Sequence, residues 1–447
     1  MAEEKAIEVV KKSDVNIDDI VAIKEEDQIG GVVAKYNDWV QREQKKYYEI
    51  DITQAMTNLT TCGSLIQLSY VSAEGFPCQK DVTAVLGGYS DLVKDSYLAS
   101  AKFVIASITG VEYVGLALKA LSKKPSLSLK LLAKCAKLAQ EMAAVAGDLS
   151  EKAKQLGDLA QKALENAVGD KTVSQADREK LVQQMNDTKA EQERLAKLQD
   201  DTAKLIQEAK KEEAEAAKAA EKEAKRNFIG NVVKNVLSLG ISGATGNDKQ
   251  GGPAAERLKT VTENKHKYQQ QLLDANSNLA KQVSLLGSYT EKKDQLQRAI
   301  ASITVTIQTL GKIKVIFGNT RLFWKGVEAN CNRLLTLQDQ VAELASDADM
   351  IEIFIDEIRG AIRESGLTWF ILCKVNWQAK EAIIAVDKRM DGILNDLPDE
   401  AGALELVDTL SKQMAQELAD EKKAIEESMA PAIEDNPQPE ANSNEED

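Results

Sequence analysis

Residues 258–314 read LKTVTENKHKYQQQLLDANSNLAKQVSLLGSYTEKKDQLQRAIASITVTIQTLGKIK, and this stretch decides the fold. Taking every third and fourth residue alternately from Leu258 gives seventeen positions, of which thirteen are apolar or Tyr. An apolar stripe with a period of 3.5 residues over about eight heptads is typical of one long helix packed against a neighbour. At 1.5 Å per residue this helix would be about 85 Å long. The register continues to Leu335, so we predict one descending coiled-coil arm over residues 254–345.

A second helical arm precedes the first one, in residues 169–226. Apolar and small residues from Leu195 to Ala209 again alternate at spacings of three and four, within a polar stretch that contains no proline. Two long helices joined by 27 residues are expected to fold back on each other as an antiparallel hairpin. We therefore predict that the face from Leu195 to Ala209 contacts the stripe from Leu272 to Ile303.

The composition of the whole chain favours an all-α fold. Aromatic residues make up 4 % and charged residues 29 % of 447 residues, and there are seven prolines, a mixture that suits long helices with thin cores. We predict an elongated helical bundle with a long antiparallel coiled-coil hairpin and a short apolar head. The expected parts are an acidic N-terminal arm (1–30), base helices and lower coiled coil (31–168), the ascending arm (169–226), the head (227–253), the descending arm (254–345), further base helices (346–398) and an acidic, largely disordered tail (399–447).

Charge and cysteine content narrow the classes of function. The net charge is −14, and the tail 399–447 holds fifteen acidic residues against three lysines, so the body is close to neutral and nucleic acid is not an expected partner. Five cysteines at wide spacings, without C-x-x-C, indicate a reducing compartment. The N-terminus has no apolar signal region, and there is no charge-free apolar run of eighteen residues. We expect a protein made in the cytoplasm without a cleavable signal, which folds in water.

The joint between the two arms, NFIGNVVKNVLSLGISGATGNDKQGGP (residues 227–253), differs from both arms because its charge density falls and six glycines appear. As a helix it has a wide apolar arc and a narrow polar line. The apolar residues are Phe228, Ile229, Val232, Val233, Val236, Leu237, Leu239 and Ile241, and the polar line includes Asn231, Lys234, Asn235 and Ser238. Two readings remain open: a concealed segment that inserts into a membrane, or a connector helix packed on its own bundle.

A second apolar stretch, residues 98–121, is long enough to span a membrane but contains Lys102, Glu112 and Lys119, so we interpret it as a buried helix of the base. Lysines follow it closely, at positions 119, 123, 124, 130, 134 and 137. Such a run is either a solvated helix face or a contact for anionic lipid headgroups.

No catalytic centre is visible in the sequence. The single histidine, His266, lies between two lysines in the heptad stretch and is interpreted as a surface helix residue. The glycines at 240, 243 and 246 are not followed by Lys-Ser or Lys-Thr, so they do not form a phosphate-binding loop. We predict that the protein is not an enzyme and uses no cofactor and no metal ion.

A helical base, two long arms and a glycine-rich apolar joint together resemble the cytolysin-A-type α-helical pore-forming toxins. That family includes the haemolysin BL, non-haemolytic enterotoxin and Xax/Yax components and the Cry6-type insecticidal proteins. Residues 310–334, LGKIKVIFGNTRLFWKGVEANCNRL, are similar in character to the segment where the descending arm of those proteins re-enters the base. The likeness is one of architecture and covers most of residues 31–398.

The resemblance implies a function for the head. In that family a soluble monomer hides the head, releases it at a membrane and assembles into a ring. The eight apolar residues named above would then insert into lipid and the four polar residues would line the pore, while Gly230, Gly240, Gly243, Gly246, Gly251 and Gly252 would act as hinges. The implied partners are target-cell lipids or a receptor, and further copies of the chain or a partner toxin subunit. The alternative is an intracellular coiled-coil scaffold that uses the head as a docking patch.

Overall fold

A computed structural model of the chain describes residues 52–121, 124–169, 276–344 and 397–429, and single helical positions or short runs within 179–197, 270–274 and 359–388. This part of the chain contains helices, turns and short connections but no strand. The prediction of an all-α fold is therefore confirmed. The acidic N-terminal arm, the head and most of the ascending arm lie outside the described residues.

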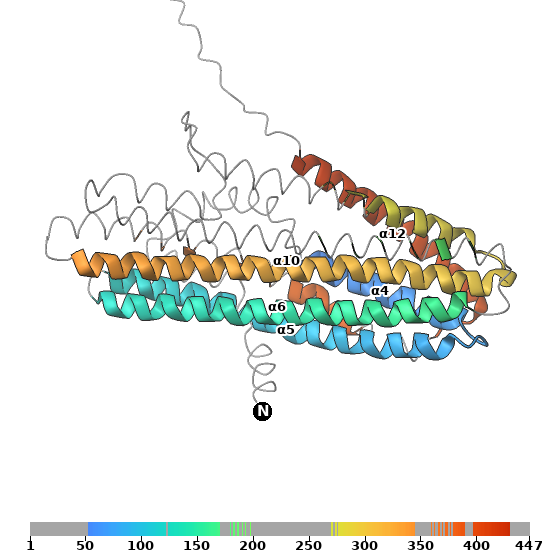
Figure 1. Cartoon of the computed structure of the whole chain (residues 1–447), viewed down its shortest axis with the longest axis horizontal. Coiled ribbons are helices and arrows are strands. Elements are labelled where there is room, and N and C mark those ends of the chain that lie inside the picture. The colour runs from blue at the N-terminus through green and yellow to red at the C-terminus, as the bar shows by residue number, and fades with distance from the viewer. Residues whose placement is uncertain are drawn as a thin grey trace, which may run out of the picture.

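Long helices form an elongated bundle, most of them along one axis (Figure 1). They are α4 (Ile52–Ser72), α5 (Gln79–Leu121), α6 (Pro125–Val168), α10 (Gln295–Leu344) and α12 (Glu400–Met429), with an unlabelled helix at 276–288. The helix 276–288 and α12 are inclined to the others (Figure 1). At 1.5 Å per residue the 50 residues of α10 extend about 75 Å. The short turn between α4 and α5 includes Gly75, whose φ of 81° is a left-handed conformation that glycine adopts without strain.

The main core runs along the bundle between α10 and α6, with α4 and α5 beside them. On α10 the buried face includes the predicted stripe residues Ile300, Ile303, Ile307 and Leu310. On α6 it consists largely of alanines, at positions 139, 143, 146, 153, 160 and 163. Small residues on one helix let the larger side chains of the other pack close to its backbone, so the C-terminal half of the stripe has α6 as its partner.

The predicted single descending arm is wrong at residues 289–294. The helix over 276–288 ends there, and Lys292–Asp294 form a short 3-10 helix before α10 begins. Leu279 and Thr309 line the same cleft, although thirty residues of straight helix would separate them by about 45 Å. The chain therefore reverses at this point, and the heptad stripe is divided between two helices.

Local hydrogen bonds explain why the helix breaks here. The N–H of Glu291 donates to Asp294 Oδ2 at 3.3 Å, while the Glu291 side chain accepts from the N–H of Asp294, which is a reciprocal capping box. Arg298, almost fully buried, donates through Nη1 to the carbonyl oxygens of Tyr289 (3.3 Å) and Glu291 (3.4 Å) and through Nε to Ser72 Oγ of α4 (3.1 Å). The turn is thus tied to the neighbouring helix.

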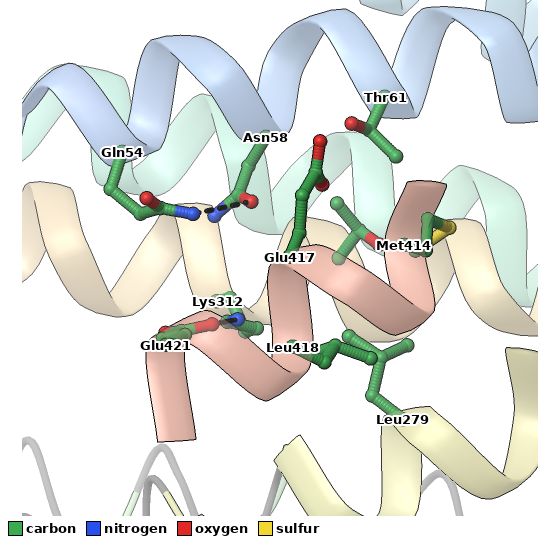
Figure 2. A pocket seen from close by; sticks show the side chains of 10 residues that line it. Gln54, Asn58, Thr61, Leu279, Lys312, Met414, Glu417, Leu418 and Glu421 are labelled. Carbon is green, nitrogen blue, oxygen red and sulfur yellow. Dashed lines mark hydrogen bonds and ion pairs between the residues drawn. The ribbon is translucent and has the colours of Figure 1, made fainter. Parts of the chain in front are cut away.

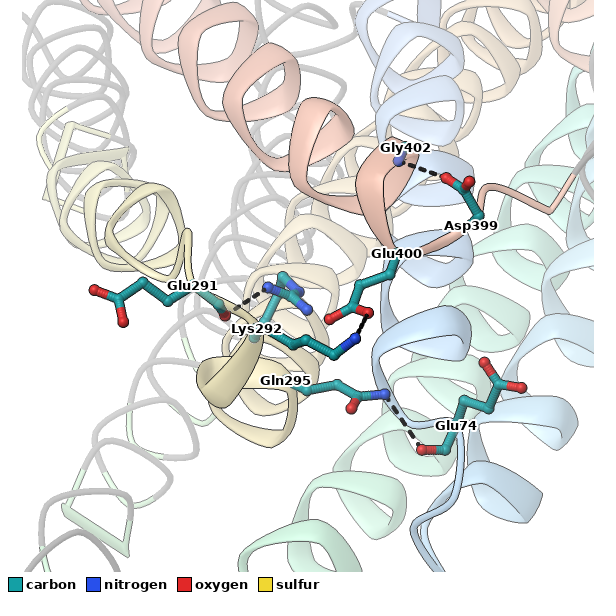
Figure 3. Close-up of polar contacts among 8 residues, drawn as sticks. Glu74, Glu291, Lys292, Gln295, Asp399, Glu400 and Gly402 are labelled. Carbon is teal, nitrogen blue, oxygen red and sulfur yellow. Dashed lines mark hydrogen bonds and ion pairs between the residues drawn. The ribbon is translucent and has the colours of Figure 1, made fainter.

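The same end of the bundle carries contacts from three parts of the chain (Figure 3). Gln295 donates to the carbonyl oxygen of Glu74, after α4, at 3.3 Å. Lys292 Nζ lies 2.5 Å from Glu400 Oε2 at the start of α12. Asp399 caps α12 by accepting from the N–H of Gly402 at 2.8 Å.

Residues 400–429 form a regular helix, α12, so the prediction of a largely disordered tail from residue 399 is wrong over this part. Its buried side chains are Ala403, Val407, Leu410, Met414, Leu418 and Ile425. Most of them join Leu279, Val283 and Leu286 of the helix 276–288 in a second apolar cluster with α4 and α10. The acidic residues fall mainly on the exposed face, which is how an acidic segment can still pack as a helix.

Candidate functional site

The predicted head lies outside the described residues. All of its proposed membrane-inserting, pore-lining and hinge residues fall between Phe228 and Gly252. The predicted contact between the face Leu195–Ala209 and the stripe Leu272–Ile303 is also untested for this reason. Both remain predictions.

Two described helical segments have the length and apolar composition needed to cross a membrane, Gln79–Leu121 and Lys292–Ala329. Half of the most apolar eighteen-residue window is buried in the first, and 78 % is buried in the second. The first contains the stretch 98–121, whose predicted burial is only partly realised, because Leu116 is 51 % exposed. The second is the central helix of the bundle.

The hydroxyl groups of this central segment are largely satisfied within the helix itself. Thr304, Thr306, Thr309 and Thr320 each donate to the carbonyl oxygen four residues before, at 2.8–2.9 Å. A hydroxyl bonded in this way needs no partner from a neighbouring helix or from water. The segment can therefore carry these polar side chains in an apolar environment at little cost.

Lys312 of α10 forms a buried ion pair with another helix. Its Nζ lies 2.5 Å from Glu421 Oε2 of α12, and the side chains are 6 % and 8 % exposed. Lys312 is thus paired only while α12 is in place. Removing one partner of a buried ion pair is strongly destabilising, because the other charge stays desolvated.

This ion pair borders a small, partly open cleft between α4, α10 and α12 (Figure 2). Asn58 and Thr61 of α4 line the cleft, and both are buried. Gln54 donates to Asn58 Oδ1 at 3.4 Å, but Asn58 Nδ2 and Thr61 Oγ1 have no hydrogen-bond partner. An unsatisfied buried polar group costs about 1–3 kcal/mol, so α12 covers α4 less favourably here than at its apolar N-terminal half.

Towards the opposite end of α10, the core is aromatic. Trp324 stacks on Phe103 of α5 with ring centroids 5.9 Å apart and lies 5.6 Å from the ring of Trp369. Gly110 of α5 lets the Trp369 ring approach, because a Cβ there would lie 2.1 Å from its Cε3 atom. Asn376 donates to Ser107 Oγ of α5 at 2.8 Å. Trp369 and Asn376, both from the segment 346–398, therefore pack against α5.

The described residues offer little reactive chemistry. No group of three or more His, Cys, Asp or Glu side chains within them could hold a metal ion. All five cysteines are buried, free thiols. Burial raises the pKa of Cys62 and Cys135, and it raises the pKa of Cys331 to about 11, partly offset by a hydrogen bond from Ser365. Thiols with a raised pKa are poor nucleophiles at neutral pH.

Sequence reasoning missed the role of α12 and its ion pair. A signal was present, since Ala403, Val407, Leu410 and Met414 follow the helical spacing of four, three and four. The acidity of the segment concealed this pattern.

The chain matches no known protein-family model. It also has no match among curated proteins.

Proposed function

We propose that this protein is an α-helical pore-forming protein, acting alone or as one component of a multi-part toxin. It covers apolar helical surface within its bundle, releases the head (residues 227–253) into a target membrane and assembles with further copies or with a partner subunit. In this proposal, the contacts of α10 with α4, α6 and α12 keep its apolar surface covered before the protein meets a membrane.

The observation that carries the proposal is that the segment Lys292–Ala329 is both strongly apolar and largely buried. It is long and apolar enough to cross a membrane, yet 78 % of its most apolar window is buried. Its threonine hydroxyls bond to the helix's own backbone. These threonine hydroxyls would stay hydrogen-bonded if the helix exchanged protein neighbours for lipid, whereas Arg298 and Lys312 would first have to leave their partners on α4 and α12.

Two further features support the proposal. The helices are far longer than the usual three or four turns, and α5, α6 and α10 lie in one elongated bundle, so apolar surface is spread along a rod (Figure 1). The sequence also places eight large apolar residues in the short joint 227–253. Fully buried, they represent roughly 12–24 kcal/mol, which a hairpin tip two helices thick cannot cover.

The proposal is tested by release of a trapped dye from liposomes, with particle size measured before and after detergent. The parent protein should release dye and form detergent-stable oligomers. Val233→Asp with Val236→Asp should abolish release, because a carboxylate in hydrocarbon costs several kcal/mol in each protomer of a ring. Lys234→Glu, in the same segment but on the polar line, is the matched control and should alter ion selectivity while keeping release.

Two outcomes would overturn the proposal. The parent protein could fail to release dye at any concentration, or the aspartate variant could lyse liposomes as well as the parent. In either case the coiled-coil scaffold, with the head as a docking patch for another protein, becomes the better account.

A further inference from the structure

The connection between α5 and α6 is the most basic part of the chain. Residues 113–140 contain six lysines and no acidic residue, in a protein whose net charge is −14. The nearest acidic residues in sequence are Glu112 before this stretch and Glu141 after it. So marked a local excess of one sign creates a positive field at this place whatever the overall charge.

The fold places Lys119, Lys124 and Lys130 close to one end of the bundle. Helix α5 ends at Leu121 and α6 begins at Pro125, and the N–H of Lys124 donates to the carbonyl oxygen of Ala120 at 2.7 Å in the tight connection. This connection lies at the end of the bundle where α10 also ends (Figure 1). The exposed side chains from both helices form what we call the lysine tip: Leu116, Lys119, Lys124, Leu127, Lys130 and Lys134.

Two large apolar side chains are exposed within the lysine tip. Leu116 is 51 % and Leu127 is 44 % exposed, and they have the highest exposure among the large hydrophobic residues of the described ranges. Each lies three positions before a lysine, Lys119 or Lys130, so leucine and lysine are neighbours on the same helix face. Exposed leucines beside lysines are typical of surfaces that sit at a lipid headgroup boundary.

The lysines further along α6 are already engaged with protein groups. Lys134 Nζ lies 5.2 Å above the ring of Tyr113, and Lys137 Nζ lies 3.8 Å from Glu141 Oε1 in an exposed pair. The cation over Tyr113 keeps its full charge and is held beside α5. Within the lysine tip, Lys124 and Lys130 therefore present exposed positive charge beside the α5–α6 connection.

We propose that the lysine tip docks on an anionic membrane surface. The lysines contact the phosphate or carboxylate groups of the lipids, and Leu116 and Leu127 enter the boundary with the acyl chains. Charge complementarity selects an anionic partner, and the two exposed leucines favour lipid over nucleic acid, which offers no apolar layer to receive them. The inference concerns docking alone and does not depend on pore formation.

The test is co-sedimentation of the full chain with vesicles of phosphatidylcholine alone or with about a third phosphatidylserine. We expect binding to the anionic vesicles, and its loss when salt rises from about 0.1 to about 1 M, which shortens the screening length from about 10 to about 3 Å. Each lysine near an anionic surface is worth about fivefold in affinity, so Lys124→Gln with Lys130→Gln should weaken binding about 25-fold. The matched control is Lys154→Gln with Lys162→Gln, on exposed positions of the same helix away from the tip.

A second variant separates the apolar contribution. Leu116→Ser with Leu127→Ser should weaken binding to anionic vesicles while leaving its salt dependence unchanged, and a helical circular-dichroism spectrum like the parent's shows that the variant folds. Equal binding to both kinds of vesicle overturns the proposal. So does a control variant that loses as much affinity as the tip variant, or a tip that binds single-stranded RNA and not vesicles.

Docking and pore formation fail separately. Val233→Asp with Val236→Asp should still sediment with anionic vesicles although it releases no dye. If the parent binds anionic vesicles through the tip but never releases dye, the pore-forming proposal fails and the docking surface stands.

Discussion

Replacing Lys312 by Met should release α12 from the bundle while leaving the main core folded. Methionine is unbranched like lysine but one atom shorter and uncharged, so Glu421 remains as a buried carboxylate that is 8 % exposed and has lost its partner. Breaking a buried pair in this way costs about 3–5 kcal/mol. Because α12 lies outside the main core and packs in a separate apolar cluster, this cost is relieved by local opening of α12 instead of global unfolding.

Hydrogen exchange measures this opening amide by amide. At about 1.4 kcal/mol per tenfold, the loss corresponds to an increase of about two to nearly four powers of ten in the opening equilibrium of α12. Amides of α12 between Ala403 and Ile425 should exchange faster by that factor, and amides of α6 should not change. Lys312→Met combined with Glu421→Met should recover most of the protection, because an apolar pair of similar volume has no unpaired charge.

Lys412 supplies the matched control on α12 itself. It pairs with Asp408 at 2.7 Å, but the side chains are 76 % and 61 % exposed, and an exposed pair four residues apart contributes only about 0.3–0.5 kcal/mol. Lys412→Met should therefore change exchange of α12 by about twofold at most. Unchanged α12 protection in Lys312→Met, or a double variant that opens more than either single one, would refute the assignment of this pair as the contact that depends on α12.

Three other outcomes follow from the described packing. Gly110→Ala should lower the unfolding temperature, at a cost of about 1–3 kcal/mol or more, because its Cβ would lie 2.1 Å from the Trp369 ring; Gly115→Ala on the same helix meets no atom within 4 Å and should be neutral or stabilising. Arg298→Met should speed proteolysis and amide exchange at residues 289–294, and Lys at this position should not rescue the turn, because it lacks the planar fork that reaches three acceptors. The free energy of unfolding should fall as pH rises from about 9 towards about 11, because the thiol of Cys331 ionises near pH 9.0 in the unfolded chain while burial holds its pKa at about 11 in the folded one. Urea titrations measure the dependence of this free energy on pH, which Cys331→Ala should weaken. An unchanged dependence in Cys331→Ala would contradict the raised pKa.

The helical fold and the buried face of α10 could be predicted from the sequence because both rest on short-range patterns. The stripe from Leu296 to Leu310 is buried as its spacing predicts, whereas the cluster of Phe103, Trp324 and Trp369 became visible only in the structure. The periodicity of a sequence does not show which helix packs against an apolar face. The stripe of α10 could be expected to be covered, but only the structure shows that the alanine face of α6 covers it.

The break at residues 289–294 shows how a heptad register can hide a reversal of the chain. Tyr289, Lys293 and Leu296 occupy consecutive stripe positions, so the spacing continues unbroken across the turn. The competing signal is Glu291 with Asp294, a capping pair of the kind that starts a helix, placed just after Gly287 and Ser288. The capping box contributes only about 1 kcal/mol, which is too little to break a well-packed helix by itself. The chain therefore reverses here because both halves of the stripe also pack better in the reversed arrangement.

The reversal at residues 289–294 also indicates which helix could leave the bundle without unfolding the main core. In the folded bundle the helix 276–288, α12 and the first half of α10 share one apolar cluster, held at the turn by Arg298 and beyond it by the pair Lys312–Glu421. Neither contact belongs to the larger core between α10 and α6. An event that displaced α12 would therefore uncover Lys312 and the face of α10 beside it without dissolving the rest of the rod. Under the proposed function, α12 covers a face of α10 that becomes exposed when the protein meets a membrane. Amide hydrogen exchange in the presence of anionic vesicles tests this: on binding, amides of α12 should exchange faster and amides of α6 should not. If both helices stay equally protected, α12 has no part in the mechanism.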